Sequence, residues 1–205
     1  MTGSAPPGSP AGPYAGRGHN VVSAPLPQTL FSEAQISRRV SELSTAIAAD
    51  PRLTIRPAVA LVALSGAFVF AADLLRELYG RGLDLPVDFI GLSSYGAGTT
   101  TEGTVRLTRN PVLEVTDRTV LLIDDIIDSG HTLNFAVRHF TEAGAAEVVT
   151  CVLLDKPARR VISISPDYAG FECPDEFVVG YGMDFAGDYR GLPYVGVIRQ
   201  PQQPA

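Results

Sequence analysis

Three aspartates and a glycine-containing turn stand together at residues 120–133, in the order VLLIDDIIDSGHTL. The apolar run that begins this segment is typical of a strand buried on both faces of a parallel sheet. Asp124 and Asp125 would then lie at the carboxyl edge of the sheet, where α/β folds bind ligands, as acceptors for hydroxyl groups or as partners of a metal ion. Asp128 follows three residues later, in a position that leaves it free to handle a proton.

The turn after these aspartates has the composition of an anion site. Ser129, Gly130, His131 and Thr132 offer hydroxyls and backbone N–H groups at the start of a predicted helix, which suits a phosphate group. His131 is expected to contribute its backbone N–H rather than its imidazole. Taken singly, the same residues are also common at strand ends and helix caps. Their combination in one short segment favours a phosphosugar site.

Composition limits the classes of function. The chain has 205 residues, enough for one domain with a sizeable core. Its net charge of −6 provides no basic surface for nucleic acid, and no apolar run is long enough to span a membrane. We therefore expect a cytoplasmic protein that binds neither nucleic acid nor a membrane. Cys151 and Cys173 lack metal-ligand spacing and are expected to be reduced thiols.

Alternating strands and helices are predicted around the aspartates. A helix is predicted from Ser32, which forms a capping-box pattern with Gln35, to about Asp50. Further strands are predicted at residues 58–64, 87–93, 119–123 and 147–154, and helices at 67–79 and 132–143. This alternation predicts an α/β fold with a central, mainly parallel sheet flanked by helices.

The ends of the chain and one internal stretch differ from this pattern. Residues 1–27 are rich in proline and glycine and are expected to form a disordered tail, which leaves 28–205 as a single domain with its core at about 55–156. Irregular residues from about 157 to 198, together with the N-terminal segment, are expected to form a small hood over the sheet edge. The glycine-rich stretch 94–104, which includes Ser94 and Tyr95, suits a mobile lid or a hairpin loop.

The segment 120–133 resembles the phosphoribosyl diphosphate (PRPP) motif of the type I phosphoribosyltransferases. Three further segments make the chain similar to the bacterial hypoxanthine-guanine phosphoribosyltransferases: SSYG at 93–96, LLDKPARR at 153–160 and GFECPDEFVVGYGMDF at 170–185. The resemblance implies the type I phosphoribosyltransferase fold. It also implies Mg²⁺-dependent transfer of the 5-phosphoribosyl group of PRPP to hypoxanthine or guanine, which yields IMP or GMP and pyrophosphate in purine salvage.

On the PRPP side, the resemblance implies that Asp124 and Asp125 bind the ribose hydroxyls and magnesium. It makes Asp128 the catalytic acid/base that faces N7 of the purine. The 5′-phosphate would lie on residues 129–132. Contacts to pyrophosphate would come from Leu64, Ser65, Gly66 and Arg190, and the lid would include Ser94 and Tyr95.

On the purine side, the resemblance implies that Lys156 donates to the 6-oxo group and that Phe177 stacks on the base. Val178 would contact the base through its backbone, and Asp184 would contribute to the purine site and bind a second magnesium ion. Lys156 is the one lysine among 16 basic residues, which indicates that this position needs a compact ammonium group. The family also implies a homodimer or homotetramer.

Three positions depart from the usual family pattern. Ser65 replaces a lysine, Asp124 replaces a glutamate, and Glu176 stands where a lysine is common. These departures keep open a second hypothesis, a divergent paralogue that acts on a purine-like base such as a deazapurine in specialised metabolism. A third hypothesis, a PRPP-binding regulatory protein, normally requires a basic surface or an added DNA-binding domain, and the acidic chain offers neither.

Overall fold

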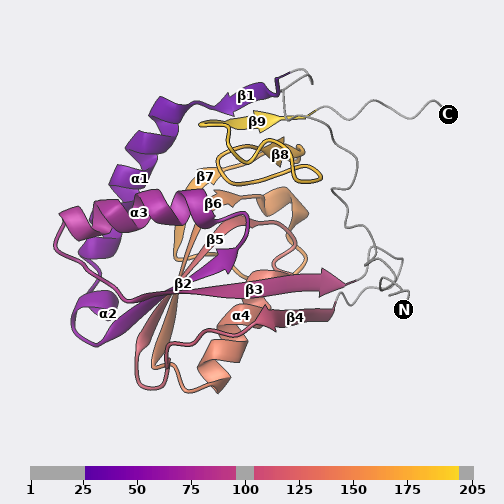
Figure 1. Ribbon diagram of the computed structural model, residues 1–205. Coiled ribbons are helices and arrows are strands. Elements are labelled where there is room, and N and C mark those ends of the chain that lie inside the picture. Colours follow the sequence, from indigo (N-terminus) through magenta and orange to yellow (C-terminus); the bar gives the residue numbers. More distant parts are fainter. Residues whose placement is uncertain (1–25, 96–103, 199–205) are drawn as a thin grey trace, which may run out of the picture.

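The computed structural model describes residues 26–95 and 104–198, and its centre is a six-stranded sheet in the order β4-β3-β2-β5-β6-β7 (Figure 1). Neighbouring strands are parallel except for the antiparallel pair β3–β4. The strands are β2 (Ala58–Leu64), β3 (Val87–Tyr95), β4 (Thr104–Arg109), β5 (Thr119–Ile127), β6 (Glu147–Asp155) and β7 (Tyr168–Glu172). The carboxyl ends of the parallel strands therefore meet at one edge.

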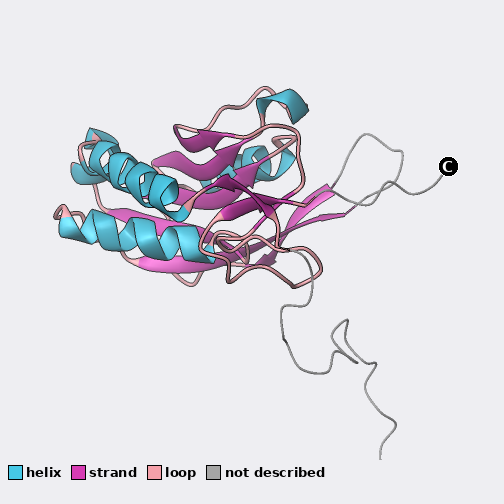
Figure 2. Cartoon of the chain, turned by 90° about the horizontal axis from the view of Figure 1, so that it is seen from above, coloured by secondary structure: helices cyan, strands magenta, loops and turns pink. Residues whose placement is uncertain are grey.

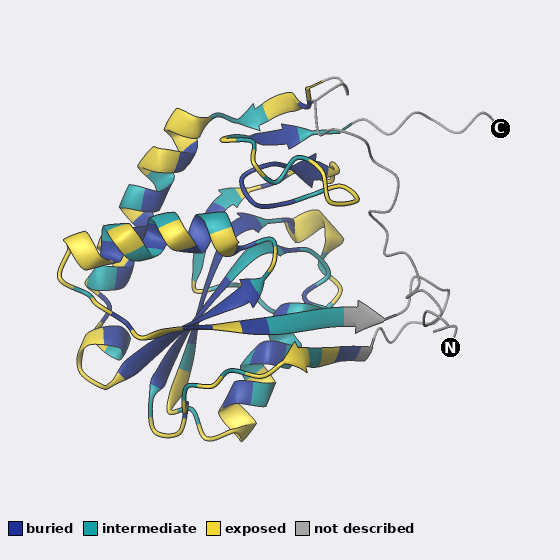
Figure 3. Ribbon diagram, in the orientation of Figure 1, coloured by how far each residue is buried: buried dark blue, intermediate teal, exposed yellow. Residues whose placement is uncertain are grey.

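Helices cover both faces of this sheet because its central strands are apolar on both sides. Side chains alternate along β2, so that Ala60 and Val62 pack towards α1 (Glu33–Ala48) and α3 (Phe68–Gly80). Val59 and Leu61 pack on the opposite face, towards α4 (His131–Glu142). Figure 2 shows α1 and α3 side by side, and Figure 3 shows how completely β2 is buried.

A second, three-stranded antiparallel sheet lies beyond the carboxyl ends of the central strands (Figure 1). Its order is β1-β9-β8, from β1 (Gln28–Phe31), β9 (Val195–Val197) and β8 (Val178–Val179). Segments from both ends of the described chain thus pair in one small sheet. We call this sheet, together with the connection 180–194 between β8 and β9, the hood. It lies above the edge at which β2 and β5 end.

The main helices and strands agree with the sequence predictions, and the N-terminal capping box of α1 is present, with the Ser32 N–H donating to Gln35 Oε1 at 2.9 Å. The predicted helix to Asp50 was too long: α1 ends at Ala48, and Asp50 caps a separate short helix, α2 (Pro51–Thr54). Proline at the first helical position explains the new start. Strands β1, β4 and β7 were not predicted as strands, and each lies at the edge of a sheet. β1 pairs with β9 from the other end of the described chain, whereas β4 forms a hairpin with the preceding strand β3.

Several predictions concern other parts of the chain. Most of the predicted tail (1–25) and most of the predicted lid (96–103) lie outside the described residues. Cys151 and Cys173, which were predicted to be reduced thiols, are both buried and unbridged. Within the described ranges, none of the helices combines the length and apolar character that crossing a bilayer demands.

An ion pair between the buried Asp50 and the partly exposed Arg52 joins α2 to the edge of the central sheet. The Asp50 carboxylate accepts from the backbone and guanidinium of Arg52, at 2.9 and 3.0 Å, and from the Tyr168 hydroxyl at 2.7 Å. Arg52 also contacts Asp167 at 2.7 Å. The hydrogen bonds from Arg52 hold the pKa of Asp50 below its usual value, although burial acts in the opposite direction.

We predict that Asp50→Asn lowers the free energy of unfolding at pH 7 by about 2 kcal/mol, since it removes the charge of a buried carboxylate that accepts hydrogen bonds from Arg52 and Tyr168. A carboxyl whose pKa is lower in the folded state stabilises above its unfolded pKa. The difference between variant and wild type should therefore shrink as the pH falls below 3.8, the unperturbed value. Urea unfolding across this range measures it, with exposed Asp84→Asn as control; an equal loss at every pH would contradict the prediction.

Candidate active site

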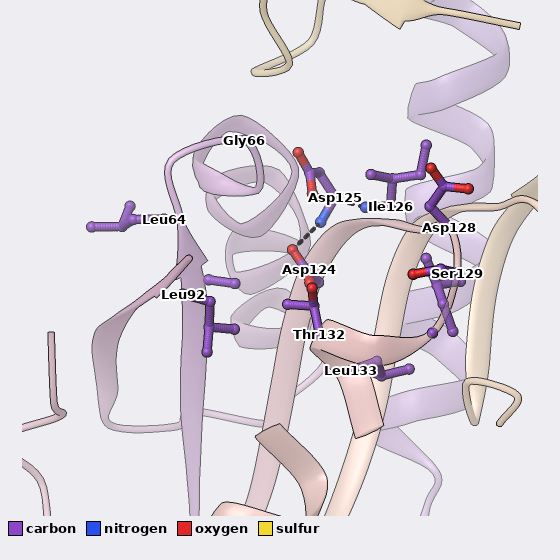
Figure 4. Close-up of a pocket in the computed structure, with 13 residues that line it drawn as sticks. Leu64, Gly66, Leu92, Asp124, Asp125, Ile126, Asp128, Ser129, Thr132 and Leu133 are labelled. Carbon is purple, nitrogen blue, oxygen red and sulfur yellow. Dashed lines mark hydrogen bonds between the residues drawn. The ribbon is translucent and has the colours of Figure 1, made fainter. Parts of the chain in front are cut away.

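A cavity of about 270 Å³ opens at the carboxyl edge of the central sheet, where β2, β3 and β5 end (Figure 4). The predicted acidic pair, the turn after it and the segment after β2 all contribute to its walls. Its lining comprises Ala63, Leu64, Gly66, Leu92, Asp124, Asp125, Ile126, Ile127, Asp128, Ser129, Gly130, Thr132 and Leu133.

Asp124 and Asp125 lie within β5, near its C-terminal end, because the strand continues to Ile127. The Asp125 N–H donates to Asp124 Oδ1 at 2.9 Å, and the Ile126 N–H donates to Asp125 Oδ1 at 2.9 Å. The pKa of Asp124 is well above its usual range, because burial disfavours the charged form and because the Asp125 charge is adjacent. Burial also raises the pKa of Asp125. A cation bound here would lower both values.

Gly66 makes room for the Asp125 carboxylate. A Cβ at residue 66 would lie 1.6 Å from Asp125 Oδ2, so any larger side chain collides with the carboxylate (Figure 4). The peptide bond between Leu64 and Ser65 is cis. A Cβ at Gly182 would lie 2.2 Å from the Gly66 carbonyl oxygen, so the hood lies directly on this turn. The segment 64–66 is thus enclosed between β5 and the hood.

The turn from Ser129 to α4 has the geometry of an anion site. Gly130 precedes the helix with φ of 91°, in the left-handed region that favours glycine. The first amides of α4 have no partner within the helix, and the helix N-terminus favours negative charge. Ser129, Gly130 and Thr132 line the cavity, whereas His131 is not among the described lining residues.

A second cavity, of about 490 Å³, adjoins the first and shares Gly66, Asp125, Ile126 and Asp128 with it. The hood and the residues after β6 supply its other walls. Those walls consist of Ser65, Lys156, Arg159, Asp175, Glu176, Phe177, Val178, Met183, Asp184 and Arg190. The sequence-predicted purine residues are therefore together in one cavity.

Lys156 and Phe177 face this cavity with different surroundings. Lys156 is buried, with 5% of its surface exposed, and its Nζ donates to the Glu176 carbonyl oxygen at 2.6 Å. Phe177 remains 43% exposed and packs edge to face with Phe185, with ring centroids 5.5 Å apart. An aromatic face that is left partly open beside a buried ammonium suits a flat, polar ligand.

Asp184 and Arg190 form an ion pair within the hood. Arg190 Nη2 lies 2.6 Å from Asp184 Oδ1, while Asp184 Oδ2 accepts from the Gly187 N–H at 2.6 Å. Arg190 also donates to the Gly182 carbonyl at 2.7 Å. Both carboxylate oxygens of Asp184 thus have a partner within the hood, and each oxygen keeps a further lone pair that a metal ion could use.

Asp128 lies at the junction of the two cavities. Its Oδ1 is 3.0 Å from Arg159 Nε, and Arg159 also contacts Asp175 at 3.3 Å. Sequence reasoning assigned no role to Arg159 or Asp175. Both residues stand within the family-like segments 153–160 and 170–185, but the contact between these segments exists only in the folded chain.

Only the two ends of the predicted lid, residues 94–95 and 104, lie within the described part of the chain. Ser94 and Tyr95 belong to the end of β3 and pair with Val105 and Thr104 of β4, so the ends of this stretch form a hairpin. The remainder of the predicted lid falls within 96–103, outside the described residues. Among the described side chains of β3, Leu92 lines the first cavity.

A sequence profile of the family described as phosphoribosyl transferase domain matches residues 32–186. The chain belongs to this phosphoribosyl transferase family. It is 40% identical to a Bacillus subtilis hypoxanthine-guanine phosphoribosyltransferase over 174 residues, which cover 85% of the chain and 94% of that protein. It is 37% identical to an Escherichia coli hypoxanthine phosphoribosyltransferase over 171 residues, covering 83% and 94%.

Solved structures of phosphoribosyl transferases agree with this assignment. A hypoxanthine-guanine phosphoribosyltransferase from Bacillus anthracis superposes with a TM-score of 0.75 at 39% identity, covering 86% of this chain and all of that one. A hypoxanthine phosphoribosyltransferase from Staphylococcus aureus gives a TM-score of 0.78 at 33% identity, covering 84% and 91%. The predicted family and the predicted type I phosphoribosyltransferase fold are confirmed.

We predict that Gly66→Ala weakens PRPP binding at least about tenfold while changing thermal stability little, because the new methyl group must displace the Asp125 carboxylate at the cavity wall. Calorimetric titration with PRPP and Mg²⁺ measures the affinity. Gly80→Ala is the matched control, since a Cβ there meets nothing within 4 Å. Normal PRPP affinity in Gly66→Ala would show that the Asp125 position is not needed for binding.

Proposed function

We propose that this phosphoribosyl transferase moves the 5-phosphoribosyl group of PRPP to a 6-oxopurine, hypoxanthine or guanine, and releases pyrophosphate in purine salvage. The observation that carries the proposal is the pair of adjoining cavities. One combines carboxylates with a helix N-terminus, the other combines a buried lysine with an open aromatic face, and Asp128 lies between them. The names of the B. subtilis and E. coli relatives support the same substrate class.

The first cavity suits the phosphoribosyl group. The turn 129–132 and the N-terminus of α4 offer amides and hydroxyls to the 5′-phosphate. Asp124 and Asp125 would accept hydrogen bonds from the ribose hydroxyls. Backbone amides of the segment 64–66 and the Arg190 guanidinium would contact the pyrophosphate. Negative charge increases there as the bond between ribose C1 and the pyrophosphate oxygen breaks.

Magnesium fits this arrangement. Mg²⁺ in phosphate-transfer sites typically takes one or two carboxylates and completes its coordination with substrate phosphates and water. Asp124 and Asp125 supply such carboxylates, and in the described ranges no group of three acidic, histidine or cysteine side chains forms a metal cage. When bound with PRPP, the ion would offset negative charge on the leaving pyrophosphate. We propose Asp184 as a further magnesium partner.

The second cavity suits a 6-oxopurine. Lys156 Nζ would exchange its bond with the Glu176 carbonyl for one with the 6-oxo group, and Phe177 would stack on the base. Val178 would contact the base through its backbone. A 6-amino group would present donors to the lysine, so adenine is disfavoured. Asp128 would then exchange a proton with N7 at the junction of the cavities.

The family relationship also supports self-association, and we propose a homodimer or homotetramer. No nucleic acid or membrane enters the proposed reaction. Size-exclusion chromatography with light scattering measures the oligomeric state directly.

The experiment that tests the function is pyrophosphate release with PRPP and Mg²⁺ against hypoxanthine, guanine, xanthine, adenine and deazapurine bases. We expect turnover with hypoxanthine or guanine and little with adenine. Asp128→Asn should retain PRPP binding but lower turnover by about 10² or more, because proton transfer loses its acceptor. Activity with a deazapurine alone would establish the divergent-paralogue hypothesis, and PRPP binding without any turnover would refute an enzymatic role.

A second prediction uses the single lysine. Lys156→Ala should raise KM for the base by about tenfold or more and change KM for PRPP by less than about threefold. The reason is that Lys156 lines the second cavity and not the first. Steady-state kinetics with each substrate varied in turn measures both. An amine-reactive reagent should also modify Lys156 more slowly when GMP is bound. An equal rate of modification with and without GMP would place the base elsewhere.

A further inference from the structure

Two consecutive arginines after β6 contact the same turn but in different ways. Arg160 has a side chain that is only 15% exposed, and its Nε donates to the backbone oxygen of Asp128 at 3.0 Å. Its other nitrogens contact the Asp155 carboxylate and the Ile164 carbonyl. Arg160 therefore fixes the backbone of the turn and has little freedom to act on a ligand.

Arg159 instead contacts the side chain of Asp128. Its Nε lies 3.0 Å from Asp128 Oδ1, and its Nη1 lies 3.3 Å from Asp175 Oδ1. The Arg159 side chain is 51% exposed and lines the second cavity. Asp175 precedes Phe177 in the segment that leads to the hood. Arg159 thus connects the turn after β5 with the wall that carries the aromatic face.

Asp128 needs such a contact because of its neighbours. Its side chain is 44% exposed as a whole, but its Oδ1 is buried and has no hydrogen-bond partner among the described residues. Asp125 lines both of the same cavities, and its negative charge repels a second carboxylate. The Arg159 guanidinium is the positive charge in contact with this buried oxygen, and its attraction favours the side-chain position in which Oδ1 faces Arg159. Proton transfer is sensitive to displacements of this size.

We propose that Arg159, held in place by Asp175, is a positioning residue that orients the Asp128 carboxylate towards the base. The proposal rests on the proposed function, because it requires Asp128 to exchange a proton with the purine. It assigns Arg159 an effect on turnover that passes through Asp128 and not through PRPP.

The first test compares Arg159→Gln with Arg159→Lys. Arg159→Gln should lower kcat roughly tenfold while KM for PRPP and the melting temperature stay close to those of the wild type. Arg159→Lys should recover part of the loss because it restores the charge. Arg138→Gln is the matched control, since Arg138 is an exposed arginine on α4 that pairs with Glu142. A lower melting temperature without a kinetic change in Arg159→Gln would show a structural role and overturn the proposal.

The second test is a double-mutant cycle with Asp128→Asn. Arg159→Gln should cost nothing further in kcat when Asp128 is already replaced, because the residue through which it acts is gone. Asp175→Asn should lower kcat in the same direction as Arg159→Gln, by a smaller factor. An equal tenfold loss from Arg159→Gln in both backgrounds would overturn the proposal. A wild-type protein with no transfer activity would instead refute the proposed function, so the two failures are distinguishable.

Discussion

Asp124 and Asp125 repel one another at the half-buried carboxyl end of β5, and the surrounding structure accommodates that repulsion. Burial raises the pKa of both carboxyls, while Arg190 supplies a positive charge that acts on Asp125 in the opposite direction. Gly66 leaves the space that the Asp125 carboxylate occupies. A site arranged in this way favours a divalent cation and the hydroxyls of a sugar over an apolar ligand.

The hood places the base-binding groups against this acidic edge. Tyr181 in the hood donates its hydroxyl hydrogen to Asp73 of α3 at 2.6 Å, and Gly182 lies on the Gly66 carbonyl. Phe177 and Arg190 are therefore held by the same hood segment that contacts the turn after β2. These contacts hold the hood against the turn after β2, and the two cavities therefore adjoin.

The departures from the usual family pattern have different structural consequences. Lys156 bonds to the backbone oxygen of residue 176, so a glutamate in place of the common lysine leaves this contact intact. Ser65 removes a positive side chain beside the cavity, but Arg190 still lines the same cavity. Asp124 keeps its carboxylate within reach of the adjacent backbone, with its Oδ1 accepting from the Asp125 N–H. These contacts explain how the reaction class can be retained despite the substitutions.

Local patterns in the sequence determined the alternating strands and helices and the capping box of α1. They also determined the segment in which the aspartates precede a predicted phosphate-binding turn. Each of these features depends on residues close together in the chain. The same motifs indicated the family before any geometry was available. Tertiary structure alone decided which residues share a cavity. Gly66 and Asp125, or Asp128 with Arg159 and Asp175, meet only because parallel strands bring their carboxyl ends to one edge. Edge strands β1 and β7 were likewise decided by pairing with distant partners, since short segments have too little intrinsic preference to form strands by themselves.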